Sequence, residues 1–296
     1  MANLKNIKRQ IQSVSNTQKT TRAMKLVSTA KLRRAEELAK RSRLFSNKIN
    51  QVIAEIAGRI KCHNVNGIAN RSFTKNENPK TVDIIFVTAD KGLCGGFNVQ
   101  TIKAVNKLLS EFESKQANVR LRGVGKKGIE YFKFKEIKLF DEVRDLSSKP
   151  DLERSNQYIA SSIRDFNDGL TDALYIVYNG YKNVITQELH VNQILPLDVD
   201  KFKCEDPAKE SLLEVEAYNQ EVMLSSLVNK YAEQNMYYAL IDSVAAEHSA
   251  RMQAMDAATN NAKQMVKTLN VQYNKARQAA ITTELIEIIS GVESMK

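Results

Sequence analysis

The stretch IDSVAAEHSARMQAMDAATNNAKQMVKTLNVQYNKARQAAITT, residues 241–283, decides the fold of this chain. It contains no glycine and no proline, the two residues that break helices most strongly. Its apolar and small residues recur at alternating steps of four and three, the spacing by which helices pack in a left-handed coiled coil. We call these positions the seam: Ile241, Ala245, His248, Met252, Met255, Thr259, Ala262, Val266, Leu269, Tyr273, Ala276, Ala280 and Thr283.

Two long segments, one near each end of the chain, contain no helix breaker. They are residues 1–57 and 208–290, whereas all four prolines and ten of the eleven glycines lie between 58 and 207. Helices of that length would reach about 85 Å and about 125 Å, too long for one compact domain. The sequence therefore predicts a coiled-coil helix at 1–57, a globular α/β domain at 58–207 and a second coiled-coil helix at 208–296.

The N-terminal segment has a less regular apolar pattern, interrupted by a wholly polar section between Ser15 and Arg22. We expect its apolar face to pair antiparallel with the C-terminal helix, and its polar section to turn toward something else. The difference in length would leave about 39 Å of single helix. The predicted apolar face consists of Leu4, Ile7, Ile11, Val14, Val27, Ala30, Leu38, Phe45, Ile49, Val52 and Ile56.

Residues 58–207 alternate short apolar segments with amphipathic ones. Strands that alternate with helices predict a mostly parallel, Rossmann-like sheet, and the long last strand predicts an antiparallel addition to it. The predicted strands are 82–87, 119–124, 137–140, 173–178 and 184–195, and the predicted helices are 99–112, 126–132 and 152–166.

The net charge of +10 comes from the N-terminal segment. Residues 1–57 hold 13 Lys/Arg and 3 Asp/Glu, whereas residues 208–290 hold 7 and 10. Such a stripe suits a polyanion, an acidic protein surface or a membrane face, although a solvated helix face gives the same pattern. A basic coiled-coil nucleic-acid binder is an alternative, but no aromatic residue precedes Phe45 to stack on bases. A transit peptide is a further alternative, against which the helical pattern continues unbroken to position 57.

The string GVGKKG at residues 123–128 matches the GxGxxG pattern, follows a predicted strand and opens a predicted helix. With Asp141 after it, this pattern leaves open a nucleotide-dependent enzyme. However, it belongs to the second strand–helix pair, and nothing after it resembles a site for hydride or phosphoryl transfer. We therefore favour a tight turn between strand and helix.

Other candidate chemistry is weak. The three cysteines show no CxxC spacing and indicate a reducing compartment with neither a disulfide framework nor a zinc site. Lys91 lacks a phosphate-loop context, and Cys94 fits a small residue in a tight turn. His248 lies on the seam without a second histidine nearby, which favours a polar residue that sets helix register. No apolar run is long enough to form a membrane helix.

Several strings together resemble the gamma subunits of rotary F-type ATP synthases. SNTQKTTRAMKLV (15–27) and AKLRRA (30–35) are similar to the N-terminal helix of that family, and DKGLCGGFN (90–98) to a turn in its globular domain. EHSARMQAM (247–255) and YNKARQAAITTELIEIISG (273–291) are similar to its C-terminal helix. The motifs occur in the family's order over nearly the whole chain and are highly specific together.

The resemblance implies an α/β domain inserted between two terminal helices that form an antiparallel coiled coil. It implies a non-catalytic rotor shaft inside a ring of three alpha and three beta subunits, with epsilon and the membrane-embedded c-ring at its globular end. Nucleotides would bind the alpha and beta subunits, so the chain itself is expected to hold no catalytic residue, cofactor, metal or nucleic acid. The initial Met directly before the matching helix favours a bacterial protein on the cytoplasmic face of the membrane.

The resemblance also implies which residues contact the ring. Basic residues near Met24 and Lys25 would face acidic loops of the beta subunits, and after Ala280 the apolar face would fit an apolar sleeve. The expected contact residues are Met24, Lys25, Arg251, Arg277, Gln278, Ile281, Thr282, Leu285 and Ile288.

Overall fold

The computed structural model describes residues 2–63, 71–74, 76, 78–197 and 220–295. Its contacts divide the chain into two compact units. We call residues 1–29 with 251–296 the terminal unit, and residues 30–250 the central unit.

Two long helices contribute to both units. Helix α1 spans Ala2–His63 and helix α5 spans Gln220–Ser294. Helix α1 passes Gly58, because one glycine costs a helix only about 1 kcal/mol. Residues 208–219, where the second helix was expected to begin, lie outside the described residues, so the division at 57 and 207 stays a prediction.

A five-stranded sheet lies in the central unit, in the order β3-β2-β1-β4-β5. Strand β1 pairs in parallel with β2 and β4, and β2 pairs in parallel with β3. Only β5 is antiparallel, which confirms the predicted mostly parallel sheet with an antiparallel addition. The strands are β1 Thr81–Val87, β2 Asn118–Val124, β3 Asp141–Val143, β4 Ala173–Tyr181 and β5 Gln187–Leu195.

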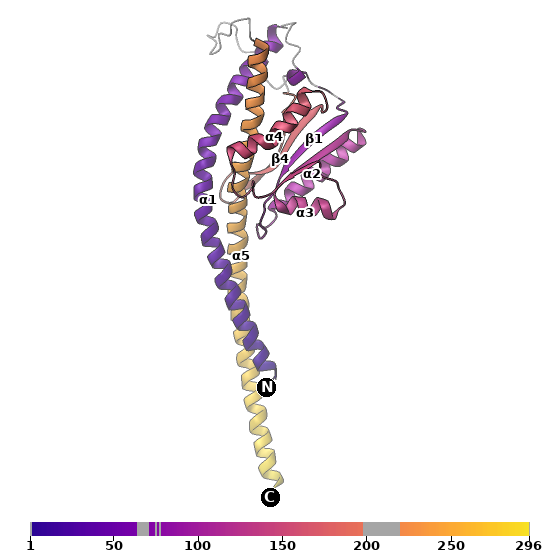
Figure 1. The fold of residues 1–296 in the computed structure, drawn as a ribbon. Helices are drawn as coiled ribbons and strands as arrows, with labels where there is room; N and C mark the ends of the chain where they lie inside the picture. Colours follow the sequence, from indigo (N-terminus) through magenta and orange to yellow (C-terminus); the bar gives the residue numbers. More distant parts are fainter. Residues whose placement is uncertain (1, 64–70, 75, 77, 198–219, 296) are drawn as a thin grey trace. The chain divides into compact units, whose positions relative to one another are not determined.

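Helices cover both faces of this sheet (Figure 1). Helices α2 (Phe97–Ser114) and α3 (Lys126–Phe134) bury Ile84 and Phe86 on one face. Helix α4 (Leu152–Asn167) packs on the other face together with residues 224–240 of α5. A short 3-10 helix, η1, spans Arg71–Phe73. The last turns of α1, through Ile49 and Ile53, and the first turns of α5 thus share a core with the sheet.

The predicted strand at 137–140 is wrong. The Ile137 amide bonds back to the Phe132 carbonyl at 3.0 Å and ends α3, and the Phe140 amide bonds to the Leu121 carbonyl at 2.7 Å. Phe140 is placed by its ring, since the Arg120 guanidinium lies 4.0 Å from the ring centroid. Strand β3 begins at Asp141, one residue after the predicted strand ends. It runs through the polar Asp141 and Glu142, which a search for apolar residues does not detect.

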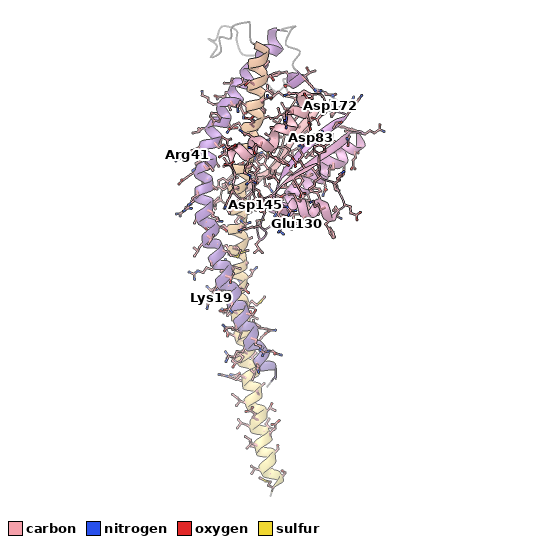
Figure 2. The ribbon with its side chains drawn as sticks, in the orientation of Figure 1. Lys19, Arg41, Asp83, Glu130, Asp145 and Asp172 are labelled. Atoms are coloured by element: carbon pink, nitrogen blue, oxygen red, sulfur yellow. The ribbon has the colours of Figure 1, made fainter. Side chains whose placement is uncertain are left out.

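A buried ion cluster joins β1, β2 and α4. Asp83, labelled in Figure 2, lies 2.7 Å from Arg120 Nε and 2.9 Å from Arg122 Nε. Both arginines also reach Asp165 of α4, Arg122 at 3.1 Å. Burial raises the pKa of Asp83, although both arginines oppose this shift. Removing one member would leave a buried charge without its partner, which destabilises the fold. The cluster therefore fixes α4 on the sheet.

Candidate functional site

The seam of the terminal unit follows the predicted spacing. Between positions 260 and 280, Ala262 is buried, and Val266, Leu269, Tyr273, Ala276 and Ala280 are half-buried; every other residue is exposed. On α1, Leu4, Ile7, Ile11 and Val14 are half-buried in the same way. The predicted spacing of the seam is confirmed between Ala262 and Ala280, whereas Thr283 is exposed.

Polar contacts join the two helices of the terminal unit. Lys25 Nζ lies 2.7 Å from Asp256 Oδ1, and the hydroxyls of Thr21 and Thr259 are 2.8 Å apart. Later residues of α1 thus meet earlier residues of α5, so the helices run antiparallel. The expectation that the polar section turns away from its partner helix is wrong, because Gln18 and Thr21 are half-buried on the α1 face.

In the central unit, α1 buries only part of the predicted face: Ile49 and Val52 are half-buried, and the side chain of Ile56 lies outside the described ones. The Arg43 guanidinium donates to the Tyr238 hydroxyl at 2.9 Å, so the antiparallel pairing holds there too. Leu38 and Phe45 are exposed, as is Val27 in the terminal unit. The buried residues are mostly small and follow steps of four and three: Leu32, Ala35, Ala39, Ser42, Ser46 and Ile53. Small side chains let two helices approach closely. The buried face of α1 is therefore the one that carries small residues at heptad spacing, and a search for large apolar residues does not find it.

The last turns of α5 form an exposed apolar end. Every described side chain from 281 to 295 is exposed, including Ile281, Leu285 and Ile288, which is 64% exposed. Contiguous exposed apolar residues mark interaction surfaces in soluble proteins. We call residues 281–295 the tip.

The remaining predicted contact residues fall in different environments. Arg277 and Gln278 are exposed on α5 just before the tip, Thr282 is exposed within it, and Met24 is half-buried on α1. Arg251, in contrast, is only 7% exposed. The structure therefore gathers the C-terminal members of the set and separates them from Met24 and Lys25.

Sequence patterning missed two residues that contact across the helix pair, Asp256 and Thr21, whereas Thr259 was predicted as a position of the seam. A usable signal exists for Asp256, the only acidic residue between Glu247 and Glu284. An isolated carboxylate opposite a helix whose first acidic residue is Glu36 indicates an ion pair.

The turn at 90–98 is held by its own side chains. Asp90 accepts hydrogen bonds from the backbone amides of Lys126 and Asp145 at 3.0 and 3.2 Å, and from the Ser147 hydroxyl at 2.7 Å. Asn98 accepts from the Ala89 amide at 2.9 Å. These bonds tie the end of β1 to the start of α3.

The GxGxxG glycines are packing positions. A Cβ at Gly125, where φ is +94°, would lie 1.9 Å from the Thr88 carbonyl oxygen. A Cβ at Gly123 or Gly128 would lie 2.7 or 2.5 Å from the Phe86 ring. The geometry favours the interpretation of a tight turn packed against β1 over that of a nucleotide site.

A buried carboxylate lies where α5 meets β4 and β5 within the central unit. Burial raises the pKa of Asp242 to about 6, although the Tyr181 amide and the Arg43 guanidinium, 3.9 Å away, oppose the shift. His190 stacks on Tyr178 at 5.0 Å between ring centroids, and burial lowers its pKa. A Cβ on Gly180 would lie 2.4 Å from Asp242, so glycine leaves room for the carboxylate.

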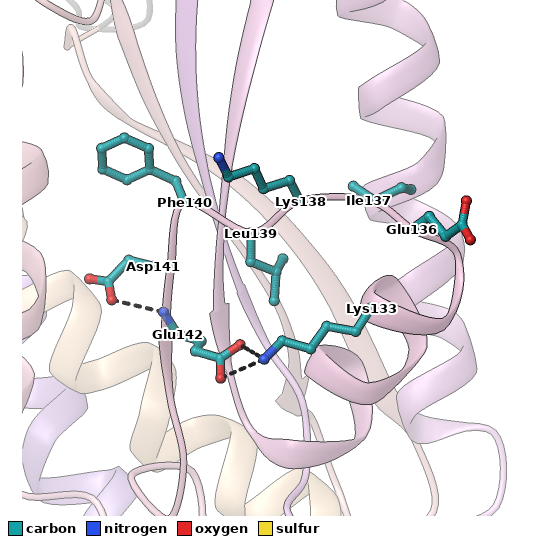
Figure 3. A pocket seen from close by; sticks show the side chains of 8 residues that line it. All are labelled: Lys133, Glu136, Ile137, Lys138, Leu139, Phe140, Asp141 and Glu142. Carbon is teal, nitrogen blue, oxygen red and sulfur yellow. Dashed lines mark hydrogen bonds and ion pairs between the residues drawn. The ribbon is translucent and has the colours of Figure 1, made fainter.

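An open cavity of about 480 Å³ lies beside α3 and β3 (Figure 3). Glu142 and Lys133 form an ion pair at 2.7 Å on its wall, and Asp141 accepts from the Glu142 amide at 2.8 Å. Lys133 and Glu142 thus pair with each other, while the Glu136 and Lys138 side chains lie apart from that pair (Figure 3). Across the described ranges, no group of three acidic, histidine or cysteine residues is placed to hold a metal, and no helix there has the length and apolarity to cross a membrane.

Comparisons with known proteins agree over the full length. A family model described as ATP synthase matches residues 3–295. The chain is 75% identical to the ATP synthase gamma chain of Sulfurimonas denitrificans over 296 residues, covering all of both chains. It is 57% identical to the ATP synthase gamma chain of Campylobacter jejuni, again over all of both chains.

Solved structures show the same fold at lower identity. One is a chain of the Euglena gracilis mitochondrial ATP synthase, with a TM-score of 0.66 and 19% identity, over 99% of this chain and 95% of that one. Another comes from the central stalk and c-ring of the Tetrahymena thermophila mitochondrial ATP synthase, with a TM-score of 0.59 and 22% identity, over 81% and 99%. With an antiparallel helix pair, an inserted α/β sheet and this similarity, the chain belongs to the ATP synthase family, among the gamma chains.

Proposed function

We propose that this chain is the central rotor shaft of an F-type ATP synthase, transmitting rotation between the membrane c-ring and the catalytic ring. As a gamma chain it is a subunit of that complex. The observation that carries the proposal is the terminal unit, where an antiparallel helix pair gives way to a tip with every described side chain exposed. Such a helix end needs a surrounding partner to cover its apolar residues.

The ring around the shaft would consist of three alpha and three beta subunits. The terminal unit holds 12 Lys/Arg and 4 Asp/Glu, so an acidic inner surface would complement it. Lys25 belongs to the predicted contact set, but its ammonium is bonded to Asp256. The other proposed contacts are Met24, Arg251, Arg277, Gln278, Ile281, Thr282, Leu285 and Ile288.

The tip would turn in an apolar sleeve. Leu285, Ile286, Ile288 and Ile289 are exposed and form one broad apolar face, which covers about 160° of the helix at 3.6 residues per turn. Apolar contacts are non-directional, so they hold the tip without favouring one angle. Fixed salt bridges would instead trap the rotor in one orientation.

Coupling follows from asymmetry. A helix pair inside a threefold ring presents a different surface to each beta subunit, so its angle favours a different state at each catalytic site. The shaft can shift those equilibria only by its differential contact energy with the states. Rotation moves this preference around the ring and links ion flow to ATP synthesis or hydrolysis.

The central unit would carry the remaining contacts, with epsilon and the c-ring. We place the chain on the cytoplasmic face of the bacterial membrane, as a peripheral subunit attached through the complex. Catalysis would belong to the beta subunits, and this chain would be non-catalytic. The packing role of the glycines in 123–128 and the Lys133–Glu142 ion pair at the cavity support this. We also propose the division into helix 1–57, α/β domain 58–207 and helix 208–296.

Co-purification tests the proposal. The chain, tagged in its own cells and extracted in mild detergent, should bring down alpha, beta, epsilon and c subunits with ATPase activity. The proposal is wrong if the tagged chain purifies alone while an active ATPase complex is recovered without it.

A further inference from the structure

The contacts within the terminal unit assign a specific part to Lys25. We propose that Lys25 is a positioning residue, which acts on coupling through Asp256 by fixing the register of α1 against α5, and not by contacting the ring. This inference rests on the proposed function of a rotor shaft.

The geometry ties Lys25 to its own chain. Its ammonium lies 2.7 Å from Asp256 Oδ1, and one turn earlier on α1 the Thr21 hydroxyl lies 2.8 Å from that of Thr259. Thr259 also donates to the Met255 carbonyl at 2.6 Å, which fixes its rotamer. Two polar contacts on successive turns therefore join the helices at one defined register.

These contacts do not supply most of the stability of the helix pair. The Lys25 and Asp256 side chains are 37% and 47% exposed, and ion pairs so exposed contribute little to the free energy of folding. The apolar seam, from Leu4 to Val14 on α1 and from Val266 to Ala280 on α5, holds the helices together.

Within the terminal unit, the apolar seam alone leaves the register of the two helices poorly specified. If α5 slips by seven residues, apolar residues still face apolar or small ones, because the heptad repeats. In one direction that slip brings Lys263 opposite Lys25, a repulsion between like charges. It also places Thr21 opposite Val266 instead of Thr259.

Asp256 has no substitute. It is the only carboxylate on α5 between Glu247 and Glu284, and the first acidic residue of α1 is Glu36. In coiled coils, single polar or charged positions specify register at little gain in stability. A slip of one heptad would move the tip by about 10 Å along the helix axis, out of its place in the ring.

Charge exchange separates this role from a direct ring contact. The variants are Lys25→Glu, Asp256→Lys and the double exchange, with Lys19→Glu as the matched control at an exposed lysine of the same helix. The measurement is the number of ions pumped per ATP hydrolysed by the assembled complex in vesicles. Each single variant should lower this ratio by roughly threefold or more, and the double exchange should restore most of it. Lys19→Glu changes the charge of α1 by the same amount without breaking the pair, so it should lower the ratio less than Lys25→Glu does.

Two outcomes overturn the proposal. If Lys25 acts on the ring, the double exchange stays as uncoupled as Lys25→Glu alone. If the single variants pump normally, the pair has no part in coupling.

A second measurement uses the isolated full-length chain and does not depend on the rotor function. A disulfide between Thr21→Cys and Thr259→Cys should form in high yield, fall several-fold when Lys25→Glu is added, and recover with Asp256→Lys. A yield unaffected by Lys25→Glu would reject the register role even if the chain proves to be a rotor. Changed yields with failed co-purification would instead reject the rotor function alone.

Discussion

Asp90 Oδ1 accepts a hydrogen bond from the Lys126 backbone amide at 3.0 Å, at the N-terminus of α3. In dinucleotide-binding folds, the amides at this place receive a phosphate. Here the next two are also occupied, since Lys127 donates to the Ala89 carbonyl at 3.1 Å and Gly128 to the Thr88 hydroxyl at 3.0 Å. A carboxylate of the chain itself stands where the anion would bind.

The first prediction concerns nucleotide binding by the isolated chain. Isothermal titration with ATP or NAD should show no binding, because the amides of α3 are already bonded and Asp90 repels a phosphate. Micromolar affinity for either nucleotide would revive the enzyme hypothesis for residues 123–128.

The second prediction tests the packing role of the same glycines. Gly125→Ala should lower the free energy of unfolding by more than about 2 kcal/mol, because it strains a positive φ and drives Cβ into the Thr88 carbonyl. Gly291→Ala is the control: it lies in α5 with open space around it, so alanine should cost nothing. Urea denaturation checks both, and equal stability of the two variants would contradict the packing role.

The third prediction is a pH dependence from Asp242. Its pKa is about 6 in the folded chain against an ordinary 3.8, so between these values the folded state binds the extra proton. Its contribution to stability is therefore present at low pH and is lost as pH rises toward 6. Asp242→Asn removes this dependence. The free energy of unfolding of the variant, relative to that of the parent, should therefore rise by on the order of 2 kcal/mol from pH 4 to pH 7.5.

Thermal denaturation of both proteins across that range measures the difference. The lowered pKa of His190 makes stability rise with pH, opposite to the effect of Asp242. His190 is present in both proteins, so its effect cancels in the difference. A stability difference that does not vary with pH would show that folding does not raise the pKa of Asp242.

The fourth prediction concerns the tip. A chain ending at Ala280 should unfold at the same temperature as the full chain, because the removed side chains that the structure describes, 281–295, are exposed. In the complex it should assemble less well or generate less torque, measured by subunit recovery and by rotation under load. An unchanged complex would contradict the sleeve, and a destabilised isolated chain would show that the tip packs on its own chain.

The sequence predicted regular elements well and failed where small or polar residues carry the structure. The α5 seam was predictable because its heptad is unbroken from Ile241 to Ala280. On α1 the buried face runs through Ala35, Ala39 and Ser42, while the larger Phe45 is exposed, so a search for large apolar residues chose the wrong side.

The candidate site was predictable only in part. Apolar spacing located the tip at Ile281, Leu285 and Ile288. The Lys25–Asp256 pair was not predicted, because a charged residue on a helix is interpreted as solvent-exposed until the residue that faces it is known.

The central claim is that this chain rotates within the ring. The direct measurement attaches a visible probe to a cysteine replacing Lys107, which is 80% exposed on α2, in a complex immobilised through its beta subunits. On addition of ATP, the probe should turn in one direction, in steps of a third of a turn. A probe that stays fixed while the same complex hydrolyses ATP at its normal rate would contradict the account.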